Sequence, residues 1–180
     1  MKYKLIDETK DHNGRTLYRI QSLTNFNDIK SGDKGGWIEN ESNLSQYDNA
    51  WVYGDAKVYG NAEVSGDAEV SGDVEVYGNA KVHDYAKVHN HAEVYGNAEV
   101  YDNAWVYGDA LIYGNARVYG NVWIYGNAEV YGNAEVYDNA KASRDAKVYD
   151  NAKVFSHARV YDDVEVYGNA KVHDYAKVHN

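Results

Sequence analysis

The sequence predicts an all-β fold in which a parallel β-solenoid of about seven triangular 18-residue coils follows an N-terminal β-hairpin cap. Three observations predict it. Residues 50–180 repeat every six residues without insertion or deletion. Aligning every third repeat gives unbroken columns of Tyr and of Asn, and the chain has no Pro to interrupt a ladder of parallel strands. A six-residue period is typical of parallel β-helices.

Residues 1–49 are expected to form the cap and an adaptor. Two short strand-like runs, 3–7 and 16–21, flank the turn signal Asn13-Gly14, which predicts a β-hairpin. Ile38 and Leu44 then fall in phase with the later repeats, so the adaptor leads into the first coil. An open solenoid end leaves strand groups unpaired, and a hairpin in this position would cover them.

Each hexad of residues 50–180 reads as a four-residue strand followed by a two-residue corner. The first position is Ala in 19 of 22 hexads and Val in the rest, and the third is Val except at Ile112, Ile124 and Ala142. The second and fourth positions are mostly charged or Tyr, so successive side chains alternate between inside and outside. Gly, Asp or Asn fills 20 of 22 fifth positions, as corners with positive φ require.

Three hexads form one coil, and columns of residues 18 positions apart support this period. One column is Tyr in every coil: Tyr59, Tyr77, Tyr95, Tyr113, Tyr131, Tyr149 and Tyr167. A second is Asn in every coil: Asn61, Asn79, Asn97, Asn115, Asn133, Asn151 and Asn169. Residues 73–90 also recur unchanged at 163–180, an offset of five coils. Stacked amides hydrogen-bond along such an axis, so we expect the Asn column to couple neighbouring coils.

The outward positions hold the aromatic residues and the charges. Of 19 Tyr, 14 occupy the fourth position, so the predicted core is Val and Ala. One column of second positions alternates in sign at every step but the last: Glu63, Lys81, Glu99, Arg117, Glu135, Lys153 and Lys171. Exposed ion pairs contribute about 0–1 kcal/mol each, so we expect these pairs mainly to hold the register of the coils.

The repeat resembles the hexapeptide left-handed β-helix of bacterial acyltransferases. Residues 26–56 (FNDIKSGDKGGWIENESNLSQYDNAWVYGDA) look more like small hexapeptide-repeat proteins of bacteria and phages, often labelled transferases without an established activity. The resemblance implies a left-handed coil. It also implies that an enzyme of this kind would use a histidine base in a cleft between subunits, commonly of a trimer.

Composition excludes several classes of protein. Without Cys there is no disulfide, no zinc–thiolate site and no cysteine nucleophile. The first residues lack the apolar core of a signal peptide, and no apolar run approaches the roughly 20 residues of a membrane helix, so a cytoplasmic protein that makes no membrane contact is expected. The net charge of −10 argues against nucleic acid as a partner.

His83 and His89 are the candidate bases of the enzyme hypothesis. Both occupy the outward position that is usually Tyr, so substitution at the surface is the favoured interpretation. A metal site made from His83, His89 and His91 would need a subunit interface, because His83 and His89 fall on different faces. Corner Asp residues fit turn chemistry better than calcium binding. We therefore expect no metal and no cofactor, and the sequence names no small-molecule ligand.

The main functional anomaly is a set of outward aromatic residues. Trp51 with Tyr53, Trp105 with Tyr107 and Trp123 with Tyr125 share one face, and Leu111 is the only aliphatic outward second position. Concentrated surface aromatics mark interfaces because they supply large contact area.

The sequence thus favours a non-catalytic rigid β-solenoid used for protein binding or self-association. The family resemblance adds a phage or prophage host-interaction or counter-defence role as one specific form. The alternative is an acyltransferase-like enzyme with sites between subunits. The C-terminal edge of the solenoid either pairs with another chain or is kept soluble by polar residues: His173, Asp174, Lys177 and His179.

Overall fold

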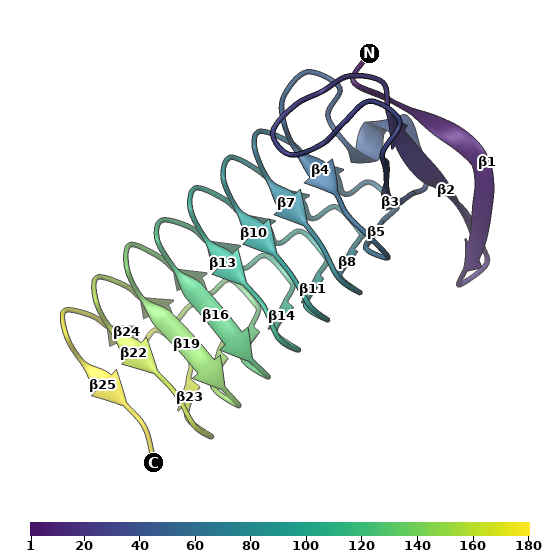
Figure 1. Ribbon diagram of the computed structural model, residues 1–180. Coiled ribbons are helices and arrows are strands. Elements are labelled where there is room, and N and C mark those ends of the chain that lie inside the picture. The colour runs from purple at the N-terminus through teal and green to yellow at the C-terminus, as the bar shows by residue number, and fades with distance from the viewer.

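The six-residue repeat folds into a three-sided rod with a hairpin across its N-terminal end. The computed structural model describes residues 1–180, and the two termini lie at opposite ends of the rod (Figure 1). In Figure 1 the strands of the near face run from upper left to lower right, while the chain advances from upper right to lower left. The coil is therefore left-handed.

Three sheets form the sides of the rod, and the 18-residue period makes each strand pair with the strand one coil later. The sheet that we call the tyrosine face has ten strands, in order β1 (Tyr3–His12), β2 (Arg15–Ser22), β3 (Lys34–Ile38), β5 (Lys57–Val58), β8 (Glu75–Val76), β11 (Glu93–Val94), β14 (Leu111–Ile112), β17 (Glu129–Val130), β20 (Lys147–Val148) and β23 (Glu165–Val166).

The tryptophan face has eight strands: β4 (Trp51–Val52), β7 (Glu69–Val70), β10 (Lys87–Val88), β13 (Trp105–Val106), β16 (Trp123–Gly126), β19 (Lys141–Arg144), β22 (Arg159–Val160) and β25 (Lys177–Val178). The third face has seven: β6 (Glu63–Val64), β9 (Lys81–Val82), β12 (Glu99–Val100), β15 (Arg117–Val118), β18 (Glu135–Val136), β21 (Lys153–Val154) and β24 (Lys171–Val172). From β4 onward every strand pair is parallel with an offset of 18 residues, as Val100↔Val118 illustrates.

The interior is a thin aliphatic prism, as the hexad pattern predicts. First- and third-position Ala, Val and Ile are almost all fully buried and belong to one cluster of 46 residues. The corners turn at the fifth position, where Gly114 has φ 73° and Asp102 has φ 57°. A β-carbon on Gly114 would come within 2.9 Å of the backbone nitrogen of Gly132 in the next coil. The close stacking of coils therefore favours glycine at that corner.

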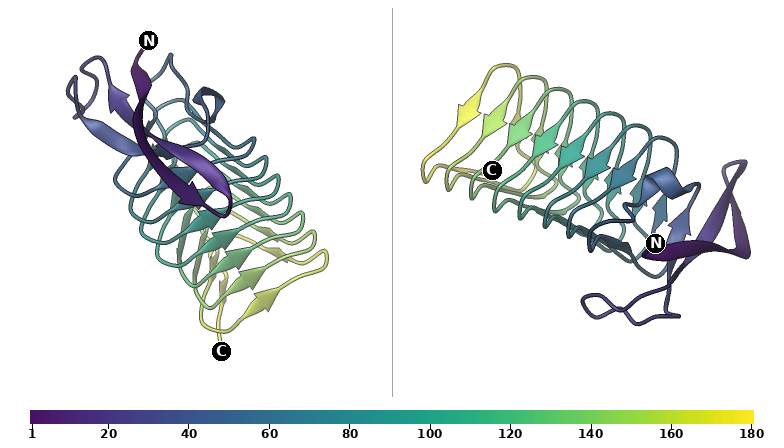
Figure 2. Two further views of the ribbon diagram at one scale, coloured as in Figure 1. Left: turned by 90° about the vertical axis from the view of Figure 1, so that its right-hand side faces the viewer. Right: turned by 90° about the horizontal axis from the view of Figure 1, so that it is seen from above.

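The cap joins the rod through the adaptor. β1 and β2 form the expected hairpin, and β3 pairs antiparallel with β2 on one side and parallel with β5 on the other. Leu44 bridges Val64 just after the 3₁₀ turn η1 (Glu41–Asn43). The predicted phase of Ile38 and Leu44 is wrong by two residues: counted in sixes from Ala50 they would take first positions, but they pair with the third-position Val58 and Val64, 20 residues later rather than 18. Two extra residues before Ala50 account for the shift, and the adaptor adds a coil to the seven counted from residue 50. Figure 2 shows the hairpin lying across this end of the rod.

Two ladders run along the outside of the rod. Asn79, Asn97 and Asn115 belong to a chain of amide hydrogen bonds in which each Nδ2 donates to the Oδ1 of the next coil, at 2.9–3.0 Å for these residues. The Tyr column forms parallel stacks with centroids 4.8–5.4 Å apart. The Tyr113 hydroxyl donates to Glu129 Oε2 at 3.1 Å, and burial together with such bonds raises the pKa of that phenol.

Candidate functional site

The tryptophan face carries the most unusual surface of the molecule. Each strand presents outward second and fourth positions, so residues one coil apart lie directly beside one another. We call Trp105, Tyr107, Trp123 and Tyr125 the aromatic patch. The two indoles stack with centroids 5.6 Å apart and planes 8° apart, and the two phenols stack at 5.2 Å and 5°. The Trp side chains remain 37% and 38% exposed, so the stack is presented to solvent.

Lysines lie at both ends of the indole stack. Lys87 Nζ is 5.6 Å from the ring centroid of Trp105, and Lys141 Nζ is 4.4 Å from that of Trp123. Each cation–π contact at an exposed site contributes about 0.5–1 kcal/mol. The two lysines thus flank the face-to-face indole stack along the rod.

A hollow of about 350 Å³ lies beside the patch, and we call it the aromatic hollow. Its walls include Ser71, His89, Trp105 and Trp123. The His89 Nδ1 lies 3.3 Å from the Ser71 hydroxyl, and the imidazole meets the Trp105 ring edge-on at 5.8 Å. Burial lowers the pKa of His89, so its imidazole is neutral at physiological pH.

The other candidate histidines lie elsewhere. His83 is on the third face, where it stacks on Tyr101 and its Nδ1 lies 3.0 Å from Asp84 Oδ2. His91 is at a corner, with Asp73 3.6 Å away on one side and Asp109 3.4 Å away on the other. The structure therefore does not bring His83 and His89 together within one chain. No group of three or more His, Cys, Asp or Glu side chains is arranged to hold a metal ion.

Trp51 was expected on the surface, and that expectation is wrong. Its side chain is 1% exposed because the cap folds over it, with Tyr3 edge-on at 6.2 Å and Phe26 at 5.4 Å. Tyr53 is half-buried beside it and donates a hydrogen bond to Asp28 Oδ1 at 3.1 Å. Both residues attach the cap to the rod, and neither is part of the exposed patch.

Leu111 is also separated from the aromatic patch. It lies on β14 of the tyrosine face, between Glu93 and Glu129, because its hexad forms the next side of the triangle. Its half-buried side chain faces away from the indole stack.

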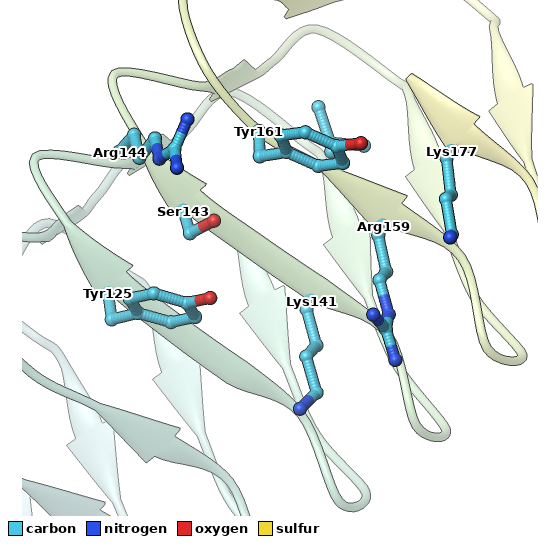
Figure 3. A pocket seen from close by; sticks show the side chains of 8 residues that line it. Tyr125, Lys141, Ser143, Arg144, Arg159, Tyr161 and Lys177 are labelled. Carbon is cyan, nitrogen blue, oxygen red and sulfur yellow. The ribbon is translucent and has the colours of Figure 1, made fainter. Parts of the chain in front are cut away.

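A second hollow, which the sequence did not lead us to expect, lies farther along the tryptophan face. This basic hollow has a volume of about 210 Å³, and its walls include Tyr125, Lys141, Ser143, Arg159, Tyr161 and Lys177 (Figure 3). Reading each column of this face would have revealed it. The fourth position changes from Tyr to Ser at Ser143, and the second position holds three cations in succession.

Comparison with known proteins supports the solenoid at the level of its repeat. Residues 110–126 match the family described as YdcK Beta solenoid repeat, and this segment includes part of the aromatic patch. A comparison with curated proteins finds no match to this chain. In the structure, no helix is long and apolar enough to cross a membrane.

Proposed function

We propose that the protein is a rigid, non-catalytic β-solenoid whose aromatic patch binds another protein surface, in the first instance a second copy of the same chain. The observation that carries this proposal is the exposed stack of Trp105 on Trp123. Interface hot spots are enriched in Trp and Tyr, and contiguous exposed aromatics on a soluble protein mark contact surfaces.

The charge distribution supports a second copy as the occupant. Beyond the patch, the tryptophan face continues with Lys141, Arg159 and Lys177, whereas the whole chain has a net charge of −10. A second copy therefore offers acidic surface to this basic column and apolar area to the indoles. Complementary charge of this kind sets orientation and association rate more than affinity.

The test compares oligomeric mass by sedimentation equilibrium. The wild type is expected to exceed the 20.3 kDa monomer mass with rising concentration, and the Trp105→Ala/Trp123→Ala variant is expected to stay at that mass. The matched control is Tyr131→Ala/Tyr149→Ala, which removes a stacked pair from the tyrosine face and is expected to associate like the wild type. A monomeric wild type, or association retained by the Trp variant, would contradict self-association through the patch.

Resemblance to hexapeptide-repeat proteins supports a finer form of this proposal. The repeat resembles small proteins of bacteria and phages. From this resemblance we propose a phage or prophage host-interaction or counter-defence role. Under this form, the partner is a host protein that takes the place of the second copy. Loss of binding to a purified host partner in the Trp105→Ala/Trp123→Ala variant is the result that would support it.

A second candidate function is acyl transfer, which the position of His89 favours over His83. His89 is neutral, half-buried and beside a hollow, as a general base requires, whereas His83 is bonded to a corner aspartate. The test is thiol release from an acyl thioester in the presence of amine or alcohol acceptors. Turnover by the wild type that is lost in His89→Gln and kept in His83→Gln would support the enzyme, and no turnover in the wild type would exclude it.

A further inference from the structure

The basic hollow is a gap in the column of aromatic side chains at the fourth positions of the tryptophan face, which we call the ring column. Along the fourth positions of the tryptophan face, Tyr107 stacks on Tyr125 at 5.2 Å and Tyr161 stacks on His179 at 4.8 Å. Ser143 stands between Tyr125 and Tyr161, where the next ring would be (Figure 3). Two coil steps of about 4.8 Å separate the flanking rings by roughly 10 Å, which is the spacing that one inserted planar ring would fill.

The side of this gap is lined by cations that nothing in the chain neutralises. Lys141 pairs in register with Arg159, and Arg159 with Lys177. No carboxylate oxygen lies within 4.0 Å of the side-chain nitrogens of these three residues. Like charges directly opposite one another on neighbouring strands are destabilising. Lys141 contacts the Trp123 ring, but the fold gives no reason for Arg159 and Lys177 to follow it.

Other lysines of the rod show the ordinary arrangement. Lys147 Nζ lies 3.0 Å from Glu129 Oε1, and Lys87 Nζ lies 2.9 Å from Glu69 Oε1, each pairing with the preceding coil. The second Ser of the same ring column, Ser71, stands beside this Glu69–Lys87 pair. A missing ring and an unpaired cation column coincide only at Ser143.

The hexad that makes the hollow departs from the repeat at three positions. In residues 140–145, Ala142 replaces Val, Ser143 replaces Tyr and Arg144 takes the corner place of Gly or Asp. Arg144 has φ 61°, in the left-handed region that an arginine adopts at a cost. Its guanidinium pairs with Asp162 at the rim of the hollow.

We infer that the basic hollow binds a nucleotide. The base lies between the rings of Tyr125 and Tyr161, above Ser143, and the phosphate lies against Lys141, Arg159 and Lys177. The cation column is two residues along the strand from the ring column, or about 7 Å, which a ribose can span. The volume of about 210 Å³ holds a base but not a whole nucleotide, so the phosphate remains at the open, basic side.

The net charge of the protein limits how many negative charges a ligand of this hollow can carry. A chain with a net charge of −10 repels a long polyanion, whereas three local cations match a few phosphate charges. The inferred ligand is therefore a free nucleotide rather than a nucleic-acid strand. The hollow shares Tyr125 with the aromatic patch and its three cations with the basic column proposed to face a second copy, so a nucleotide and a partner chain are expected to compete for this surface.

The test is calorimetric titration of the full chain with AMP, with adenosine and with inorganic phosphate. AMP is expected to bind, and adenosine and phosphate are each expected to bind about tenfold more weakly or not at all, since each supplies one part of the interaction. Ser143→Tyr is expected to abolish AMP binding by filling the gap with a ring that neighbouring coils already accommodate. Arg159→Ala is expected to weaken AMP binding about tenfold.

The matched control is Ser65→Tyr, which adds a Tyr at the same hexad position on the third face. It is expected to leave AMP binding unchanged, and unfolding curves of both Tyr variants verify that they fold. Three results would overturn the inference: no binding of AMP by the wild type, unchanged binding by Ser143→Tyr, or phosphate binding as tight as that of AMP. The last would show that the cations bind an anion without the ring gap.

Discussion

Replacing Asn97 by Ala tests whether the Asn ladder couples one coil to the next. The Asn97 amide accepts a hydrogen bond from Asn79 at 2.9 Å and donates one to Asn115 at 3.0 Å, so the substitution removes both. Each neutral hydrogen bond contributes about 0.5–1.5 kcal/mol net, which gives about 1–3 kcal/mol for the pair. Because the corner is exposed and water replaces part of the loss, we expect about 1–2 kcal/mol.

The assay is urea unfolding followed by circular dichroism, with the midpoint and the slope both measured. Asn97→Ala is expected to lower the midpoint and leave the slope unchanged, because the surface exposed on unfolding is the same. Asn169→Ala is the control. It lies in the same column and is also exposed, but its amide makes no hydrogen bond to a neighbouring coil. Equal destabilisation by the two variants would refute the reasoning, since the loss would then come from the turn and not from the ladder.

Three further predictions follow from burial and ionisation. Trp51→Ala is expected to destabilise the protein by about 3–5 kcal/mol and to make the cap sensitive to proteolysis. Trp105→Ala, which removes one ring stack and one cation–π contact at the surface, is expected to cost about 1–2 kcal/mol, and equal urea midpoints would contradict the buried cap contact. Val100→Ala, at a fully buried position in the middle of the rod, is expected to lower the free energy of unfolding by about 2 kcal/mol or more. Val178→Ala, at a half-buried position in the last coil, is expected to lower it by under about 1 kcal/mol, measured by the same unfolding curves. Burial raises the pKa of ladder phenols such as Tyr113 above that of a tyrosine in the unfolded chain. The stability that the neutral phenols give the folded protein is therefore fully present below pH 10 and is lost as the pH rises further, because the unfolded chain ionises first. Tyrosinate absorbance and circular dichroism should then change together, and ladder ionisation without unfolding would contradict this.

Periodicity allowed the architecture of the rod to be predicted, because every coil meets the same physical requirement. A buried first and third position, a corner with positive φ and an 18-residue column can each be read from one hexad and checked in all the others. The parallel register of Val100 on Val118 and the Asn ladder were predictable for that reason. The hexad phase did not extend into the adaptor, because Ile38 and Leu44 pair with residues 20 positions later rather than 18.

Features that arise where the repeat stops were not predictable in the same way. The burial of Trp51 depends on where Tyr3 and Phe26 fold, and nothing in the periodic pattern fixes that. The basic hollow is the opposite case, because its signal is in the sequence as a departure from the repeat at Ser143 and Arg144. It emerges only when outward positions are compared face by face, since the cations that line it are 18 residues apart.

The most direct test of the central claim, that the aromatic patch is the contact surface, is oxidative footprinting of tryptophan at low and high protein concentration. The proposal predicts that Trp105 and Trp123 react readily in dilute protein and become protected as the mass rises above 20.3 kDa. Trp51, which is 1% exposed, should be protected at both concentrations and serves as the internal reference. If Trp105 and Trp123 remain equally reactive in the associated state, the chain associates through another surface and the claim is wrong.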